Sequence, residues 1–283
     1  MIKTILILII AFTNISLFTL EKKHFVTCEM LGRLGNELFE VAVTCALAWD
    51  NDAEPCFLGF SKEEYEHIFF RCNSVDKTLL KDVKFKYAET SQLKYNKIPF
   101  HPDMIIAGYF QHEKYFAHHR DRIIKLFKPH DKDIEYIKKK YGWIVDNPNS
   151  VSIHVRGYNT EQLSQTTFIQ YDREYFEKAM NLFPESSLFI VTSDNPKFAR
   201  EQISIDGRDI VFITGEKHYI DFFIQTMCKH NIISNSSFSW WSAYLNTNPN
   251  KIVVRPKVWL GGYPDMSSPD DWIKIDANGV QLN

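Results

Sequence analysis

The stretch from Lys229 to Trp241 carries the densest group of residues suited to ligand binding. A β-branched pair, Ile232-Ile233, runs directly into four small polar residues, Ser234, Asn235, Ser236 and Ser237. A strand that ends in such a turn and continues into a helix presents hydroxyls, an amide and the free N–H groups of the helix N-terminus. Such groups together bind anions. The segment therefore predicts a phosphate site.

A second candidate site is the pair His154 and Arg156, which lies at the carboxyl end of the expected strand in Val151–Gly157. Strand alternation places Ser152, His154 and Arg156 on one face of this run. A parallel strand is normally apolar on both faces, so the pair has a cost unless a ligand or a counter-ion meets it. The planar fork of arginine suits a diphosphate. Two interpretations stay open for Arg156, a bound diphosphate and an internal carboxylate partner.

Two aspartates have ambiguous roles. Asp194 follows the predicted strand Leu188–Thr192, where it would accept hydrogen bonds from a ribose or a base edge. Equally, it would cap the helix that begins at Pro196. Asp221 lies in the first turn of another predicted helix, where the helix dipole already favours an acid.

The adjacent Trp240 and Trp241 are expected to pack their helix onto the sheet and so fix the polar loop before them. Asn235-Ser236-Ser237 also matches the N-glycosylation sequon. We predict that this sequon is not used, because a glycan would block the expected anion site.

Thiol and metal chemistry have little support in the sequence. Five scattered cysteines contain no CxxC pair, and their odd number leaves at least one thiol unpaired if all bridges are internal. Cys45 is expected to be buried on the apolar face of a helix. The sequence leaves undecided whether Cys56 and Cys72 form a disulfide. Neither a His/Cys/Asp group with metal-ligand spacing nor a D-x-D pair is present, so no metal is expected. A diphosphate would then be neutralised by arginine, helix N-termini and hydroxyls.

Composition excludes one class of partner. The chain has 283 residues, of which 45% are hydrophobic and 24% are charged, and its formal net charge is −2. Nucleic-acid binding requires clustered positive charge, so no nucleic-acid partner is expected. The basic run Lys138–Lys140 is interpreted as the solvated face of a helix.

Residues 1–20 form an apolar leader with one early lysine, Lys3. This pattern predicts a signal-anchor or a signal peptide, with membrane association through the leader, and a buried first strand is the alternative. A signal-anchor predicts a type II protein of the Golgi or another secretory membrane in a eukaryote. Otherwise, the expected location is cytoplasmic or membrane-associated.

Strand and helix patterns alternate along the rest of the chain. Residues 24–30 predict a strand, 31–36 a glycine turn capped by Asn36, and 38–49 a helix. The turn lacks the third glycine of a G-x-G-x-x-G loop, so it is weak evidence for a dinucleotide site. Further expected elements are strands at 56–60 and 104–110, a helix at 114–127, and a linker with a charged helix at 128–149.

A second alternating block follows the linker. Strands are expected at 151–156, 188–192, 210–214, 231–234 and 251–255, with helices at 171–183, 196–203, 218–229 and 237–246. Such alternation predicts parallel sheets covered by helices. The predicted fold is α/β, with a Rossmann-like half at 24–145, a second at 150–283, and ligands at the carboxyl ends of the strands.

Taken together, residues 24–275 resemble glycosyltransferase family 11, the α-1,2-fucosyltransferases. Five motifs in order carry the resemblance, which are Gly32–Phe39, Gly108–Gln111, His154-Val155-Arg156, Ser193-Asp194 and Cys228–Trp241, followed by Pro256–Trp259. The resemblance implies a GT-B fold with two halves facing a cleft. It also implies GDP-fucose as donor, inversion at the anomeric carbon, no metal, and a galactose-terminated glycan acceptor held by the N-terminal half.

The resemblance also implies roles for particular residues. Arg156 would hold the donor diphosphate, His154 would help to place the nucleotide, and Asp194 would contact the nucleoside. Ser234, Asn235, Ser236 and Ser237 would contact the phosphates or the fucose. The remaining donor-side positions carried over from the N-terminal loop are Gly32, Gly35 and Asn36.

One departure bears on catalysis. The family usually reads His-x-Arg-Arg-Gly-Asp, whereas this chain has Gly157 in place of the second arginine and Asn159 in place of the aspartate. Asn159 joins Arg156 and His154 in the expected catalytic set, although a neutral amide cannot act as a carboxylate base. Two alternatives to the fucosyltransferase therefore stay open, which are a catalytically impaired GDP-sugar or glycan-binding relative and another inverting enzyme such as a protein O-fucosyltransferase.

Overall fold

The computed structural model describes residues 23–158, 169–203, 207–260, 263–264, 267–276 and 281–282. The expected leader at 1–20 and the candidate Asn159 lie outside these residues. Within the described part of the chain, no helix has both the length and the apolar character needed to cross a membrane.

The N-terminal half of the chain carries a four-stranded parallel sheet in the order β2-β1-β4-β3. Its strands are β1 (Phe25–Cys28), β2 (Glu54–Pro55), β3 (Phe85–Ala88) and β4 (Met104–Ala107). The strand expected at 56–60 was wrong: pairing ends at Pro55, apart from one isolated bridge at Phe57. Gly59, with φ of +107°, then turns the chain away from an extended course.

Helix α1 (Leu34–Asp50) is buried along most of its length, because it lies between β1 and a helix of the C-terminal half. The expected single helix at 114–127 is broken into shorter pieces. Phe116 has a non-helical φ of −140° and ψ of −1°, and it separates the first piece from the next. The remaining helices here are α2 (Glu66–Phe69), α3 (Arg120–Leu126) and the 3₁₀ turns η1 (Glu63–Tyr65), η2 (Lys77–Asp82), η3 (Glu113–Tyr115) and η4 (Ala117–His119).

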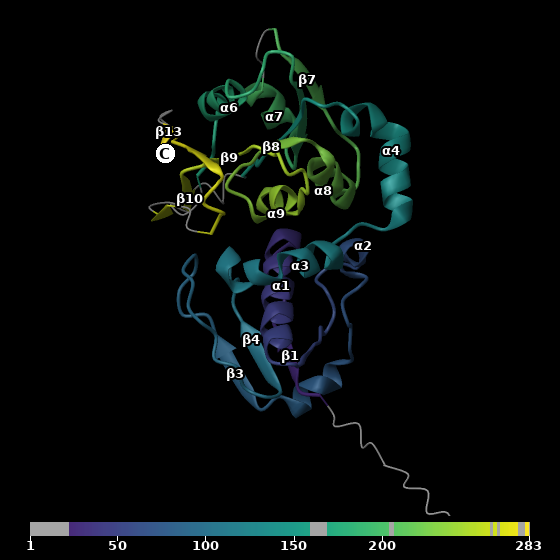
Figure 1. Cartoon of the computed structure of the whole chain (residues 1–283), viewed down its shortest axis with the longest axis vertical. Helices are drawn as coiled ribbons and strands as arrows, with labels where there is room; N and C mark the ends of the chain where they lie inside the picture. The colour runs from purple at the N-terminus through teal and green to yellow at the C-terminus, as the bar shows by residue number, and fades with distance from the viewer. Residues whose placement is uncertain are drawn as a thin grey trace, which may run out of the picture.

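Helix α4 (Asp131–Val145) is the charged helix expected in the linker, and it packs against the C-terminal half (Figure 1). That half holds a seven-stranded sheet in the order β13-β12-β9-β8-β5-β6-β7, parallel except at β13. Its strands are β5 (Ser150–Val155), β6 (Leu188–Ser193), β7 (Asp209–Phe212), β8 (His230–Ile232), β9 (Val253–Pro256), β12 (Ile273–Ile275) and β13 (Gln281–Leu282). A small hairpin of β10 (Val258–Leu260) and β11 (Tyr263–Pro264) stands beside it.

The helices of the C-terminal half are α6 (Arg173–Met180), α7 (Pro196–Gln202), α8 (His218–Met227) and α9 (Ser237–Leu245). Strand β5 comes first in this sheet. The chain then adds β6 and β7 on one side, and β8 and β9 on the other. Consecutive connections therefore run in opposite directions from the carboxyl ends of β5 and β8. Such a switch point opens a crevice in which parallel α/β sheets bind ligands.

The two halves share one hydrophobic core, and aromatic rings form its centre. Trp240 and Trp241 are fully buried, and their rings lie 4.6 Å and 5.0 Å from that of Phe39 on α1. Trp241 also stacks on Phe116, with 5.1 Å between ring centroids. The tryptophans thus join α9 to the opposite half, whereas the sequence led us to expect packing onto their own sheet. Figure 1 shows α9 facing α1 and α3 across this junction.

Candidate functional site

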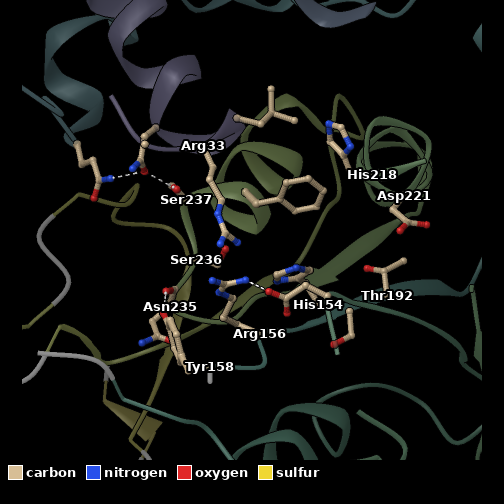
Figure 2. Close-up of a pocket in the computed structure, with 18 of the residues that line it drawn as sticks. Arg33, His154, Arg156, Tyr158, Thr192, His218, Asp221, Asn235, Ser236 and Ser237 are labelled. Atoms are coloured by element: carbon tan, nitrogen blue, oxygen red, sulfur yellow. Dashed lines mark hydrogen bonds and ion pairs between the residues drawn. The ribbon is translucent and has the colours of Figure 1, made fainter. Parts of the chain in front are cut away.

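A cavity of about 780 Å³ lies between the two halves at the switch point. Its walls come from the loop before α1, from the carboxyl ends of β5 and β6, and from the start of α9 (Figure 2). Nine of the residues expected at the site line this cavity, namely Gly32, Gly35, Asn36, His154, Arg156, Asp194, Asn235, Ser236 and Ser237. Ser234 does not line it, and Asn159 lies outside the described residues.

Ser234 uses its hydroxyl within the protein. Its Oγ donates to the carbonyl of His154 at 2.5 Å and accepts from the backbone N–H of Arg156 at 3.2 Å. The residue is 1% exposed. Ser234 therefore ties the end of β8 to the end of β5, and this tie sets where His154 and Arg156 emerge.

The Asn235 amide is also engaged internally, although the residue borders the cavity. Its Nδ2 donates to the carbonyls of Ile169 and Trp259, at 3.0 Å and 3.1 Å. A glycan attached to this nitrogen would break at least one of these two hydrogen bonds. The Asn235 carbonyl accepts from the Tyr158 hydroxyl at 3.0 Å, so the polar loop is held from several sides.

Asn36 joins the halves at the cavity wall. Its Oδ1 accepts from Gln111 Nε2 at 2.9 Å and from Ser237 Oγ at 2.8 Å, across 201 residues of sequence in the second case. Gly35 explains the closeness of this approach, since a Cβ there would lie 2.4 Å from the backbone nitrogen of Phe238. Only glycine lets the start of α1 meet the start of α9 at this distance.

Arg156 forms an ion pair with Asp194, and the same carboxylate accepts from the backbone N–H of Gly157 at 2.8 Å. The internal carboxylate partner considered for Arg156 is therefore present. Asp194 does not cap α7, because Asn195 performs that role through a 3.2 Å bond from Phe198 N–H to its Oδ1. The Arg156 side chain is 16% exposed, so its guanidinium still borders the cavity.

Gly157 has a steric reason to be glycine. A Cβ at this position would lie 2.4 Å from the Cβ of Asn195. The loop after β5 is thus pressed against the N-cap of α7, and this contact accompanies the Arg156–Asp194 pair. A second arginine at position 157 would require the two loops to separate.

Arg33 is a site residue that sequence reasoning did not select. It is exposed, it lines the cavity, and its guanidinium points toward Ser236 and Arg156 from the opposite half (Figure 2). Its positive charge helps to lower the pKa of Arg156, after the larger effect of burial. A signal was present, because Arg33 is the one cation in the glycine turn that follows β1.

His154 is a neutral imidazole at physiological pH. Burial, followed by the positive charge of Arg156, lowers the pKa of its ring to about 3. The ring packs beside Phe238, 5.2 Å between centroids, and Nδ1 is buried without a hydrogen-bond partner. A neutral ring with a free nitrogen can orient a ligand by hydrogen bonding, and it adds no charge to the cleft.

Asp221 and His218, on the first turn of α8, extend the site beyond the expected residues. Burial, and then the charge of Glu216, raises the pKa of Asp221 to about 7, and its Oδ1 is buried without a partner. His218 Nδ1 lies 3.3 Å from the carboxylate oxygen Oε1 of Glu64, while His218 Nε2 is buried without a partner. Unpaired buried polar atoms are costly. Together they mark this end of the cavity as a polar subsite.

Two further sequence expectations concern thiols and metals. All five cysteines are free, so the Cys56–Cys72 bridge left open by the sequence is not formed. Cys45 is buried in α1, as expected. Within the described part of the chain, a group of Asp50, His118 and His119 has metal-ligand character, although no spacing in the sequence indicated it. None of these three residues lines the cleft.

The chain is similar in sequence to known glycosyltransferases. The O-antigen biosynthesis glycosyltransferase WbnK of Escherichia coli is 31% identical over 226 residues, which cover 75% of this chain and 74% of that protein. Galactoside α-(1,2)-fucosyltransferase 2 of Oryctolagus cuniculus is 25% identical over 289 residues, covering 92% and 79%.

Solved structures show the fold. The chain superposes on NodZ α-1,6-fucosyltransferase soaked with GDP-fucose with a TM-score of 0.52, at 14% identity, covering 79% of this chain and 93% of that one. For POFUT1 in complex with GDP, the TM-score is 0.53 at 12% identity, covering 82% and 98%. The predicted GT-B-like α/β fold is thereby confirmed. A model of glycosyl transferase family 11 matches residues 3–262, and the chain belongs to that family of glycosyltransferases.

Proposed function

We propose that this glycosyltransferase moves fucose from GDP-fucose to a galactose-terminated glycan, with inversion and formation of an α-1,2 linkage. One observation carries the proposal: Arg33 and Arg156 reach the same cavity from opposite halves, beside the N-terminus of α9. Two guanidinium forks and a helix N-terminus are suited to a diphosphate. The names of the family relatives, which include galactoside α-(1,2)-fucosyltransferases, support the sugar and the linkage.

The polar subsite on α8 suits the guanine base. Guanine carries adjacent N–H donors on one edge, and the unpaired Oδ1 of Asp221 is a buried acceptor. Asp194, assigned to the nucleoside from the resemblance, is less suited because its carboxylate is engaged by Arg156 and Gly157. We therefore assign Asp221 to the base edge and His154 to orientation of the nucleotide.

Leaving-group stabilisation would drive the chemistry. The bond between the anomeric carbon and the β-phosphate oxygen breaks, and its electron pair moves onto GDP. The acceptor hydroxyl oxygen forms the new bond to the anomeric carbon from the opposite face, and its proton is released to solvent water. Among the described residues that line the cleft, the carboxylates are Asp194, Glu216 and Asp221, and the first two have partners. With Asn159 in place of an acid, we infer a dissociative reaction in which Arg156 and Arg33 neutralise the diphosphate.

The test is transfer by the purified chain. GDP-fucose is incubated with galactose-terminated oligosaccharides, GDP release is followed, and the product linkage is determined by NMR. Arg156→Lys should keep a positive charge but lose the fork, and it should lower kcat/KM at least 10-fold. Arg200→Lys, outside the cleft, is the matched control. Absence of transfer to every such acceptor would refute the proposal.

A non-catalytic GDP-sugar-binding relative is the second candidate, and it is favoured by Gly157 and Asn159. Calorimetric binding of GDP-fucose without turnover, together with turnover gained by Asn159→Asp, would establish it. The donor sugar needs its own test, because another relative bears the name α-1,2-colitosyltransferase. A donor panel that includes GDP-colitose distinguishes the two sugars.

We also propose that residues 1–20 attach the protein to a membrane as a signal-anchor. The apolar run after Lys3 supports this proposal. Fractionation of the full chain and of a variant that lacks residues 1–20 tests it, since recovery of both in the supernatant would contradict it.

A further inference from the structure

Three side chains that the cleft does not use converge at the far end of α1. Asp50 is the last residue of α1, and His118 and His119 lie in the η4 turn that precedes α3. The Asp50 carboxylate meets His118 Nε2 at 2.9 Å through Oδ2, and His119 Nε2 at 2.7 Å through Oδ1. The Asp50 carboxylate thus faces the Nε2 atoms of two neighbouring imidazoles.

The spacing of these atoms fits a metal ion. One ligand atom from each of the three residues lies within 4.8 Å of the others. Zinc binds imidazole nitrogen and carboxylate oxygen at roughly 2.0–2.2 Å, so tetrahedral ligands stand roughly 3.3 Å apart. The two N···O distances therefore need to lengthen by only about 0.5 Å.

Two of the three side chains are exposed enough for an ion to reach them, and the third, His119, is held in place by its neighbours. The His118 and Asp50 side chains are 48% and 42% exposed, whereas that of His119 is 18% exposed. His119 packs edge-on against Trp49, 5.3 Å between ring centroids, and the Arg122 guanidinium stacks on Trp49. Beside the group lies a second cavity of about 660 Å³, which Asp50 and His118 line.

We propose that Asp50, His118 and His119 bind a divalent transition metal ion of the zinc type. Two imidazoles with one carboxylate favour zinc, copper or nickel over magnesium or calcium, which prefer all-oxygen sites. Three protein ligands leave the fourth position to water on the side of the second cavity. The ion joins the end of α1 to η4. It takes no part in sugar transfer, because none of its ligands lines the cleft.

The experiment titrates Zn²⁺ into the metal-free, untagged full chain by calorimetry and follows the melting temperature in parallel. We expect one equivalent to bind with micromolar or tighter affinity and to raise the melting temperature. Asp50→Asn and His118→Asn should each weaken binding at least 10-fold. His24→Asn is the matched control, because His24 pairs with the carboxylate of Asp103 and, among the described residues, no second imidazole converges on that pair.

Cobalt distinguishes this site from the free thiols. Co²⁺ bound as proposed gives only weak d–d absorption, whereas thiolate binding adds an intense charge-transfer band. That band, or unchanged zinc affinity in both Asp50→Asn and His118→Asn, would overturn the proposal, as would no binding to the wild-type chain. If Asp50→Asn fails to fold, His118→Asn and His119→Gln decide, because both histidines lie in a short surface turn.

Discussion

Replacing Gly35 with alanine tests whether the close approach of α1 and α9 builds the site. The added Cβ would lie 2.4 Å from Phe238 N and 2.5 Å from Ser237 Oγ, whereas ordinary contact begins at 3.4 Å. The two helix starts must therefore separate by about 1 Å. Such overpacking costs about 1–3 kcal/mol, and the better helix propensity of alanine returns about 1 kcal/mol. We expect the free energy of unfolding to fall by up to about 2 kcal/mol.

The effect on transfer should exceed the effect on stability. Ser236 and Ser237 move with the start of α9, and a displacement of about 1 Å in a site can cost about 100-fold in rate. We therefore expect kcat/KM for GDP-fucose to fall about 100-fold, or about 2.7 kcal/mol of transition-state stabilisation. Initial rates of GDP release, with urea unfolding on the same samples, measure both quantities.

Gly142→Ala is the matched control for this substitution. A Cβ at Gly142 in α4 meets only Asp146 Oδ2, at 3.7 Å. That variant should keep full activity and gain up to about 1 kcal/mol of stability. If Gly35→Ala keeps kcat/KM within about twofold of the wild type while Gly142→Ala behaves as stated, the halves do not need this contact, and the reasoning fails.

Three further predictions follow from buried groups. Asp221→Asn should raise the KM for GDP-fucose at least 10-fold and weaken discrimination against other nucleotide sugars, and equal kinetics across such a donor panel would contradict the assignment. The pKa of His154 is about 3 in the folded state and 6.5 in the unfolded state, so the unfolded state binds the extra proton and stability should fall as pH drops from 6.5 toward 3. His154→Gln should flatten this part of a plot of unfolding free energy against pH. An unchanged slope in that variant would argue against burial of a neutral ring. Trp241→Ala should cost about 3–5 kcal/mol in urea unfolding, whereas exposed Trp143→Ala should stay within about 0.5 kcal/mol, and similar losses in both would mean that Trp241 does not hold the halves together.

Much of the fold could be predicted because local patterns report local structure. The β5 strand was expected at 151–156 and runs Ser150–Val155, and the helix expected at 237–246 runs Ser237–Leu245. Both segments contain closely spaced apolar residues and are followed by a polar residue, Arg156 after β5 and Asn246 after α9. The helix expected at 114–127 failed because two residues, Phe116 and His119, leave the helical conformation, and Phe116 packs against Trp241. Hydrophobic periodicity does not detect such interruptions.

The candidate site was predicted unevenly. His154 and Arg156 were identified because a polar face on a buried parallel strand is unusual. Ser234 was expected to face a phosphate, but a hydroxyl at the end of β8 is equally able to bond the neighbouring strand, and it does so. Asp221 stayed ambiguous because an acid in a first helical turn is common. Its burial and its unpaired oxygen appear only in the folded chain.

The sequence by itself determined the alternation of strands and helices, the ordered motifs and the polar loop before the tryptophans. These features depend on neighbours along the chain. Tertiary structure alone decided which carboxylate pairs with Arg156, how closely Gly35 meets Ser237, and that Asp50 meets two histidines 68 and 69 residues away. Such contacts depend on how helices and sheets pack, and packing brings together residues whose separation along the chain carries no local pattern.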